Sequence, residues 1–212
     1  MAGQEPLLST SLFRNRTSNL GLVTQNAQWL VLMGVSFVVS AYLQVVRGHN
    51  AIQTGVIFTA ATVGLLLSSL AAERLARRYA QQTLILVGFA TTTVGIALLL
   101  IMVSGSTTPW AFAPGLLLIG LGLGAMLTPS VNLVQSSFPD AQQGEITGLS
   151  RSVSNLGSSL GTAVAGTILV ASITATPGRA YALAMTVLGA VGVVGFIMAL
   201  MLPRSSNPSA PV

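Results

Sequence analysis

The stretch TLILVGFATTTVGIALLLIMV, residues 83–103, contains no charged side chain and is apolar along almost its whole length. A helix needs about 20 such residues to cross the hydrocarbon core of a bilayer. The stretch also lacks the strict alternation of polar and apolar residues that is typical of a half-buried strand. Because backbone groups inside a bilayer must be paired within the segment, this stretch predicts a transmembrane α-helix.

The rest of the 212-residue chain has the same character. Charged residues make up 6% of the chain and hydrophobic residues 52%, whereas soluble domains carry about 25% charged residues. We therefore expect an all-α integral membrane protein with six transmembrane helices, preceded by a lead-in over residues 1–19 and followed by a disordered tail over 204–212. Within this bundle over residues 20–203, the expected spans are about 29–46 (possible from 21), 52–72, 83–103, 111–134, 148–172 and 181–202.

The arginines are unequally divided between the two sides of such a bundle. With six crossings, both termini and the loops 73–82 and 135–147 share one side, and the opposite side holds only Arg47 and Arg179. The arginines of the richer side are Arg14, Arg16, Arg74, Arg77, Arg78 and Arg204. Since positive charge is retained in the cytoplasm, the sequence predicts a multi-pass protein of the cell (plasma or inner) membrane with both termini in the cytoplasm.

The ionisable residues do not form a catalytic or metal-binding set. All four carboxylates fall in expected loops or at helix ends: Glu5, Glu73, Asp140 and Glu145. The single histidine, His49, lies in a short loop, and the chain contains no cysteine. No serine therefore has an evident base, and no cluster has the spacing of metal ligands. We expect no enzyme activity, metal, cofactor or nucleic-acid partner, and we expect Asp140 to cap the approach to the fifth helix.

The fifth span carries an unusual polar stripe. Arg151, Ser154, Asn155, Ser158 and Thr162 recur every three or four residues, so they share one helical face. Such a stripe should contact protein or water rather than lipid. In one interpretation Arg151 reaches the cytoplasmic boundary, and the hydroxyls bond back to their own helix. In the other, the stripe lines a substrate path or an interface between helix bundles; its length of roughly 16 Å favours this second interpretation.

Other spans add polar residues to this candidate face. Asn132 and Gln135 lie near the cytoplasmic end of the fourth span, and Tyr42 and Gln44 lie toward the outer end of the first. The first span also carries three amides near its cytoplasmic end: Gln25, Asn26 and Gln28. The third and sixth spans are almost purely apolar. We therefore expect those two helices to face lipid and the others to face a more polar environment.

Two pairs of glycines indicate close helix packing. Gly120 and Gly124 are four residues apart in the fourth span, and Gly157 and Gly161 are four apart in the fifth. Each pair leaves one helix face without side chains, which lets two backbones approach closely in a membrane. The letters GLGLGA at 120–125 also fit a loose dinucleotide-binding pattern, but no strand precedes them. Helix packing is the prediction that we retain.

Three segments carry a resemblance to a known family. They are PLLSTSLFRNRTSN (6–19), SSLAAERLARRYAQQTLILVG (68–88) and PDAQQGEITGLSRSVSNLGSSLGTAVAGTIL (139–169). In order and spacing they resemble the C-terminal half of a major facilitator superfamily transporter, of the fourteen-helix drug:proton antiporter type. The loop motif is degenerate: Glu73 stands where the family has glycine and Arg77 where it has aspartate, while Arg78 matches.

The resemblance implies one half of a major facilitator fold, built as a 3+3 inverted repeat and rocking against a second bundle. It implies proton-coupled efflux of drugs or other small molecules, with the N-terminal half as partner in the lipid bilayer. A homodimer that brings two Arg151 stripes together would make a second copy the partner instead. Proton coupling requires an ionisable group within the membrane, and no carboxylate is expected there. The alternative is a non-transporting interaction module or a truncated relic that pairs with another membrane protein.

Overall fold

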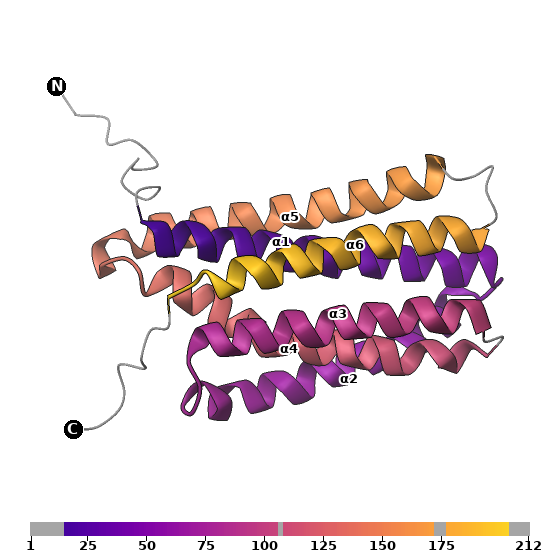
Figure 1. The fold of residues 1–212 in the computed structure, drawn as a ribbon, viewed down its shortest axis with the longest axis horizontal. Coiled ribbons are helices and arrows are strands. Elements are labelled where there is room, and N and C mark those ends of the chain that lie inside the picture. Colours follow the sequence, from indigo (N-terminus) through magenta and orange to yellow (C-terminus); the bar gives the residue numbers. More distant parts are fainter. Residues whose placement is uncertain (1–14, 106–107, 172–176, 204–212) are drawn as a thin grey trace.

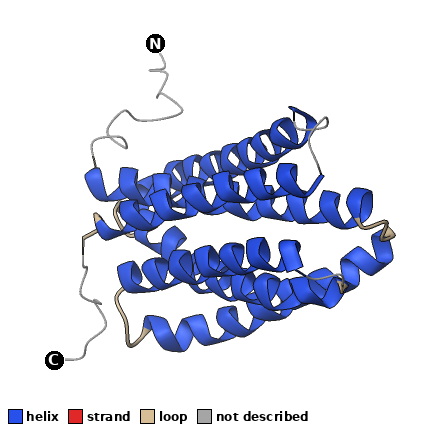
Figure 2. Ribbon diagram, turned by 45° about the vertical axis from the view of Figure 1, so that its right-hand side comes forward, coloured by secondary structure: helices blue, strands red, loops and turns tan. Residues whose placement is uncertain are grey.

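The computed structural model describes residues 15–105, 108–171 and 177–203. Within these ranges it consists of helices joined by short connections, and no strand occurs in them (Figure 2). Six helices are long and apolar enough to cross a membrane, and they lie side by side along one common direction (Figure 1). The all-α, six-helix architecture expected from composition and run length is thus confirmed.

Each expected span corresponds to one long helix. The helices are α1 (Arg16–Ala41), α2 (Ala51–Ala76), α3 (Gln81–Gly105), α4 (Ala113–Gln135), α5 (Gln143–Ala171) and α6 (Pro177–Leu200). Short helices adjoin three of them: η2 (Tyr42–Val46), a π-helical continuation of α1; η3 (Pro109–Phe112) before α4; and η4 (Asp140–Gln142) before α5. The connections from α2 to α3 and from α4 to α5 lie at the end of the bundle where the described chain begins and ends (Figure 1).

Two helices begin earlier than their apolar runs. Helix α1 begins at Arg16 because the Asn15 side chain accepts hydrogen bonds from the backbone N–H groups of Thr17 and Ser18, at 3.0 and 3.2 Å. Helix α5 begins at Gln143 rather than near Gly148. The expectation that Asp140 caps this approach is wrong: Pro139 occupies the cap position, and no side chain makes a cap hydrogen bond there.

The helices pair across the two halves of the chain rather than within each half. Helix α1 packs along α5, and α2 packs along α4. Helix α6 packs on α1 just as α3 packs on α4, while α1 meets α4 and α3 meets α6 in the middle of the bundle. Exchanging the first three helices for the last three leaves this set of pairs unchanged. Because α1 and α4 run in opposite directions (Figure 1), the arrangement is a 3+3 inverted repeat.

The four glycines picked out from the sequence lie in two of these contacts. Gly120 and Gly124 of α4 lie against α2, and Gly157 and Gly161 of α5 lie against α1. A Cβ at any of the four would overlap a backbone carbonyl oxygen of the facing helix. In the order of the glycines, those oxygens belong to Ala61, Leu65, Asn26 and Leu30. Backbone therefore rests on backbone in both pairs.

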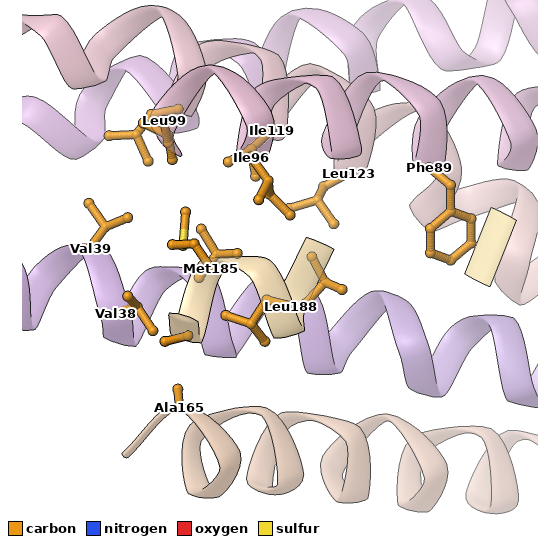
Figure 3. Close-up of a cluster of buried hydrophobic side chains, with 14 of the residues drawn as sticks. Val38, Val39, Phe89, Ile96, Leu99, Ile119, Leu123, Ala165, Met185 and Leu188 are labelled. Atoms are coloured by element: carbon orange, nitrogen blue, oxygen red, sulfur yellow. The ribbon is translucent and has the colours of Figure 1, made fainter. Parts of the chain in front are cut away.

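The apolar core lies mainly between α1, α3, α4 and α6 (Figure 3). Val38, Phe89, Leu123 and Leu188 are among the buried side chains that meet there. Helices α3 and α6 thus supply much of the core, although their outward residues are apolar and exposed. The expected division, with these two helices facing lipid and the others facing polar surroundings, is therefore incomplete. Helix α2 also exposes an apolar face, formed by Val56, Val63, Leu66, Leu67 and Leu70.

Candidate functional site: a polar cavity between α1, α4 and α5

A cavity of about 250 Å³ opens between α1, α4 and α5. Its lining residues are Gln25, Gln28, Trp29, Leu127, Val131, Gln135, Thr147, Ser150, Arg151, Ser154 and Asn155. Gln28 lies twelve residues after the first residue of α1, which corresponds to a depth of about 18 Å along the helix. Since α1 starts at the end of the bundle that carries the described termini (Figure 1), the cavity lies in that half of the membrane span.

Four residues of the predicted polar set meet in this cavity. Arg151, Ser154 and Asn155 of α5 line it together with Gln135 of α4. Gln135 donates from Nε2 to Thr147 Oγ1 at 3.3 Å, which ties the end of α4 to the first turns of α5. Periodicity on one helix and end position on another therefore identified residues that the fold brings together.

The other members of the predicted set lie elsewhere. Ser158 and Thr162 lie farther along α5, beside a shallow depression that also includes Met33. Asn132 is exposed on α4 and does not line the cavity. Gln44 is exposed in η2, where its Nε2 donates to Ser40 Oγ at 2.8 Å. The stripe is thus one face of α5, but only its first part belongs to the cavity.

The hydroxyls of the stripe are satisfied within α5. Ser154 Oγ donates to the Ser150 carbonyl at 2.9 Å, and Ser158 Oγ donates to the Ser154 carbonyl at 3.0 Å. Thr162 Oγ1 donates to the Ser158 carbonyl at 3.1 Å. This back-bonding follows the first of the two interpretations of the stripe. The hydroxyls therefore require no outside partner. Polar side chains other than these hydroxyls are the ones available to a ligand.

Polar contacts hold α5 against α1 where the cavity begins. Ser150 Oγ donates to Gln25 Oε1 at 2.9 Å, and both residues are buried. Asn26 Nδ2 donates to the Val153 carbonyl at 3.0 Å. The backbone contact at Gly157 lies in the same interface between α1 and α5. These bonds fix the position of the α5 backbone that carries Arg151 and Asn155.

Gln28, Arg151 and Asn155 line the cavity without a polar partner among the described residues. Gln28 is only 1% exposed, and neither its Oε1 nor its Nε2 makes a hydrogen bond. The Arg151 guanidinium and the Asn155 amide are exposed on α5, and no hydrogen bond or ion pair to either occurs in the described ranges. Leaving a buried polar group unpaired costs about 1–3 kcal/mol. An unpaired buried amide and an unpaired cation that line one cavity are groups that a polar ligand could satisfy.

The charge that the described residues bring to the cavity has a single sign. Among these residues, Arg151 is the one charged side chain in the lining. The described carboxylates of Asp140 and Glu145 do not line it. No group of three or more histidine, aspartate or glutamate residues occurs in the described part of the chain, so these residues offer no metal site.

Sequence reasoning noted Gln28 only as one of three amides near the cytoplasmic end of the first span, and it did not single out Trp29. Gln25, Gln28 and Trp29 are three or four residues apart on α1, so the same periodicity that revealed the α5 stripe could have found them. The signal was weak because two glutamines and a tryptophan near a helix end are also typical of the membrane interface.

The opposite end of the bundle holds an aromatic cluster. The Tyr42 ring lies 4.5 Å from that of Tyr181 and 6.0 Å from that of Phe112, centroid to centroid. The Arg47 guanidinium lies 5.5 Å from the centroid of Tyr42. Tyr42 is therefore a buried link between α1, α4 and α6, remote from the cavity. Its ring partners Phe112 and Tyr181 belong to η3 and α6, two segments that sequence spacing alone could not pair with Tyr42.

The degenerate loop motif lies at the end of α2. Arg77 and Arg78 are exposed where the chain turns toward α3. They lie at the same end of the bundle as the first turns of α5 (Figure 1) but do not line the cavity. The side chain of Glu73 lies outside the described residues.

Comparison with known proteins adds a family match. The family model described as Major Facilitator Superfamily matches residues 22–211. Among curated proteins, the chain is 28% identical over 166 residues to the multidrug efflux pump LfrA of Mycolicibacterium smegmatis, covering 78% of this chain and 33% of that protein. It is 28% identical over 170 residues to the puromycin resistance protein pur8 of Streptomyces alboniger, with coverages of 78% and 33%.

A longer match extends over most of the chain. The quinolone resistance protein NorB of Staphylococcus aureus is 25% identical over 205 residues, which cover 95% of this chain and 44% of that protein. The chain spans about a third of the length of the first two relatives and less than half of the third.

Proposed function

The chain belongs to the Major Facilitator Superfamily, and from this premise we propose that it is a six-helix bundle of a secondary active transporter that exports small organic molecules. The relatives are an efflux pump and proteins of antibiotic resistance, which supports export rather than uptake. The proposal makes the chain a transport protein rather than an enzyme.

The observation that carries this proposal is the outer face of α5. Arg151, Asn155, Ser159 and Thr162 are exposed along a helix that is long and apolar enough to cross the membrane. A guanidinium and an unpaired amide at this depth are costly against lipid. They become favourable where they line a path that holds water or substrate, and the cavity of Gln28 and Arg151 opens on the same helix.

A second bundle is part of the proposal. The chain spans about a third of the length of its first relatives, and the paired arrangement of helices matches one half of a transporter that works by alternating access. In this scheme α5 and the exposed face of α2 contact the partner bundle, which is an N-terminal half or a second copy of the chain. The excess of arginines at the end that carries the described termini supports a cytoplasmic location for that end, in the cell membrane.

Proton coupling then depends on the partner. Coupling requires a group that gains and loses a proton within the membrane, and none of the described residues that line the cavity is a carboxylate. A coupling carboxylate is therefore proposed to lie on the partner bundle. The same observation favours a second candidate function, in which the chain is a non-transporting module that pairs with an intact membrane protein.

Dye accumulation separates the two candidates. The chain is expressed in an efflux-deficient bacterium, alone and with the N-terminal half of a relative such as LfrA, and retention of a fluorescent dye is measured. Export that appears with the partner and is lost in Arg151→Ala, but not in the exposed control Arg74→Ala, supports transport. Complex formation on crosslinking without any export, under either condition, would favour the interaction module.

A further inference from the structure

We propose that the cavity between α1, α4 and α5 binds the anionic group of an amphiphilic small molecule, such as a carboxylate, sulfonate or phosphate. The Arg151 guanidinium and the Gln28 amide would hold the anionic group, and Trp29, Leu127 and Val131 would contact the apolar part. This inference rests on the proposed function, since it names the class of ligand that the transporter would take into this cavity.

The charge in the cavity is the first observation that supports an anion site. Among the described residues of the lining, Arg151 is the single charged one, and its guanidinium presents a planar set of donors that fits the paired oxygens of a carboxylate, sulfonate or phosphate. A cationic ligand would find no carboxylate among these described residues and would be repelled by Arg151. The described part of the cavity therefore selects against cations.

The hydrogen-bond donors without an acceptor are the second observation that supports an anion site. The Gln28 side chain is buried at 1% exposure, and its Nε2 lacks an acceptor. The Gln25 oxygen accepts from Ser150 at 2.9 Å, which leaves the Gln25 amide nitrogen without an acceptor among the described residues. Unused donors thus line the cavity beside a cation. An anionic oxygen is the group that all of them can share.

The apolar part of the lining indicates that the anion has an apolar tail. Trp29, Leu127 and Val131 line the same cavity of about 250 Å³. They offer an aromatic and aliphatic surface but no further charge. An inorganic ion would leave this surface without a contact, whereas an anion with an apolar tail would use both parts of the lining. Two sources share this chemistry: a soluble organic anion and the headgroup of an anionic lipid.

The chain offers a reporter at the site. It has two tryptophans, Trp29 in the cavity and Trp110 at the opposite end of the bundle. Trp110→Phe therefore leaves Trp29 as the single tryptophan, whose fluorescence is excited selectively over that of the tyrosines. The full chain with this substitution is reconstituted in nanodiscs of phosphatidylcholine and titrated with octanesulfonate or with octyltrimethylammonium, which carry the same tail and opposite charges.

We expect a saturable change in Trp29 fluorescence with octanesulfonate and no saturable change with octyltrimethylammonium. Arg151→Ala should weaken the apparent affinity for the sulfonate at least tenfold. Arg151→Lys, which keeps the positive charge but not the planar set of donors, should have a smaller effect. Gln28→Met should weaken it several-fold with unchanged helical circular dichroism. Arg74→Ala, an exposed arginine outside the cavity, should leave it unchanged.

A second titration distinguishes the two sources. Adding phosphatidylglycerol to the nanodiscs should lower the apparent sulfonate affinity, in an Arg151-dependent way, if a lipid headgroup is the natural occupant. The affinity should be insensitive to phosphatidylglycerol if the occupant is a soluble anion. Either result supports an anion site and names its source.

Equal responses to the two amphiphiles, or sulfonate binding that survives Arg151→Ala, would overturn the inference. Because binding is measured without transport, its failure is separate from failure of the proposed function. A chain that binds the sulfonate but exports nothing contradicts only the transport proposal, and a chain that exports dyes without preferring anions contradicts only the anion site.

Discussion

Two buried glutamines show that the same residue type has opposite meanings in this bundle. Gln82, at the start of α3, is 5% exposed, and its Nε2 donates to the Ala199 and Leu200 carbonyls at 3.1 Å each. It thereby closes the end of α6. Gln28 is buried still more fully, but its amide has no partner. Gln82 therefore serves the fold, and Gln28 is retained at a cost to it.

This contrast gives a matched pair of substitutions. Gln28→Met removes an unsatisfied amide and keeps an apolar stem of similar size, so the free energy of unfolding should rise by about 1–3 kcal/mol. Gln82→Met strands two carbonyls at the end of α6 and should lower it by a similar amount, about 1–3 kcal/mol. Unfolding in detergent, followed by circular dichroism, measures both. If Gln28→Met destabilised the chain as much as Gln82→Met, the amide would have an unseen partner, and Gln28 would no longer support a binding site in the cavity.

At this scale the sequence revealed the stripe but not its chemistry. Spacing alone placed Arg151, Ser154 and Asn155 on one face of a helix, and they do line one cavity. It could not decide which of them needs a partner, because a serine is satisfied by the carbonyl four residues earlier whereas Asn155 is not. Nor could it separate Gln28 from Gln82, since the difference lies in neighbours from distant parts of the chain.

Among the elements, the contact between α1 and α5 depends on small residues at defined positions. Gly161 faces the Leu30 carbonyl so closely that a Cβ would overlap it. Gly166, five residues later on the same helix, has only the Phe37 ring near, at 3.7 and 3.9 Å from where a Cβ would lie. The same residue is therefore required at one position and replaceable at the other.

Substituting alanine at these two positions tests the contact. Gly161→Ala should force α5 away from α1 and destabilise the chain by about 1–3 kcal/mol, the usual cost of overpacking. Gly166→Ala should be neutral or stabilise it by up to about 1 kcal/mol, because alanine favours the helix. Thermal unfolding in detergent compares the two variants. If the two variants were equally stable, the backbones of α1 and α5 would not be in contact at Gly161.

The element scale also shows where pattern recognition stops. Small residues four apart, such as Gly120 and Gly124, indicated a close approach, and they lie against the α2 backbone; run lengths indicated the six long helices but not η2, η3 or η4. The partner helices did not follow from the sequence, because two glycines provide a flat helix face but do not identify the helix that packs on it. Early starts such as that of α1 at Arg16 were missed because Asn15 caps a polar turn that hydropathy does not register.

At the scale of the whole molecule, the inverted repeat explains why α2 and α5 are the outlying helices. Each packs mainly on one helix of the other half, α2 on α4 and α5 on α1, and each exposes its remaining face. The two faces differ: α2 exposes leucines and valines, whereas α5 exposes Arg151 and Asn155 as well as apolar side chains such as Leu156 and Leu160. A bundle with one polar flank is suited to a polar path or a partner along that flank, and lipid is suited to the apolar faces of α3 and α6.

This asymmetry can be measured because the chain contains no cysteine. Ser159→Cys places a thiol on the exposed face of α5, and Val94→Cys places one on the exposed apolar face of α3, both well inside their helices. A maleimide reacts with the thiolate, which forms in water and is suppressed in hydrocarbon. In native membranes, N-ethylmaleimide should therefore modify Ser159→Cys much faster than Val94→Cys, and the two should react alike after unfolding in detergent. Equal protection of both thiols would mean that α5 faces lipid or a dry interface, and a water-filled path along its polar stripe would have to be abandoned.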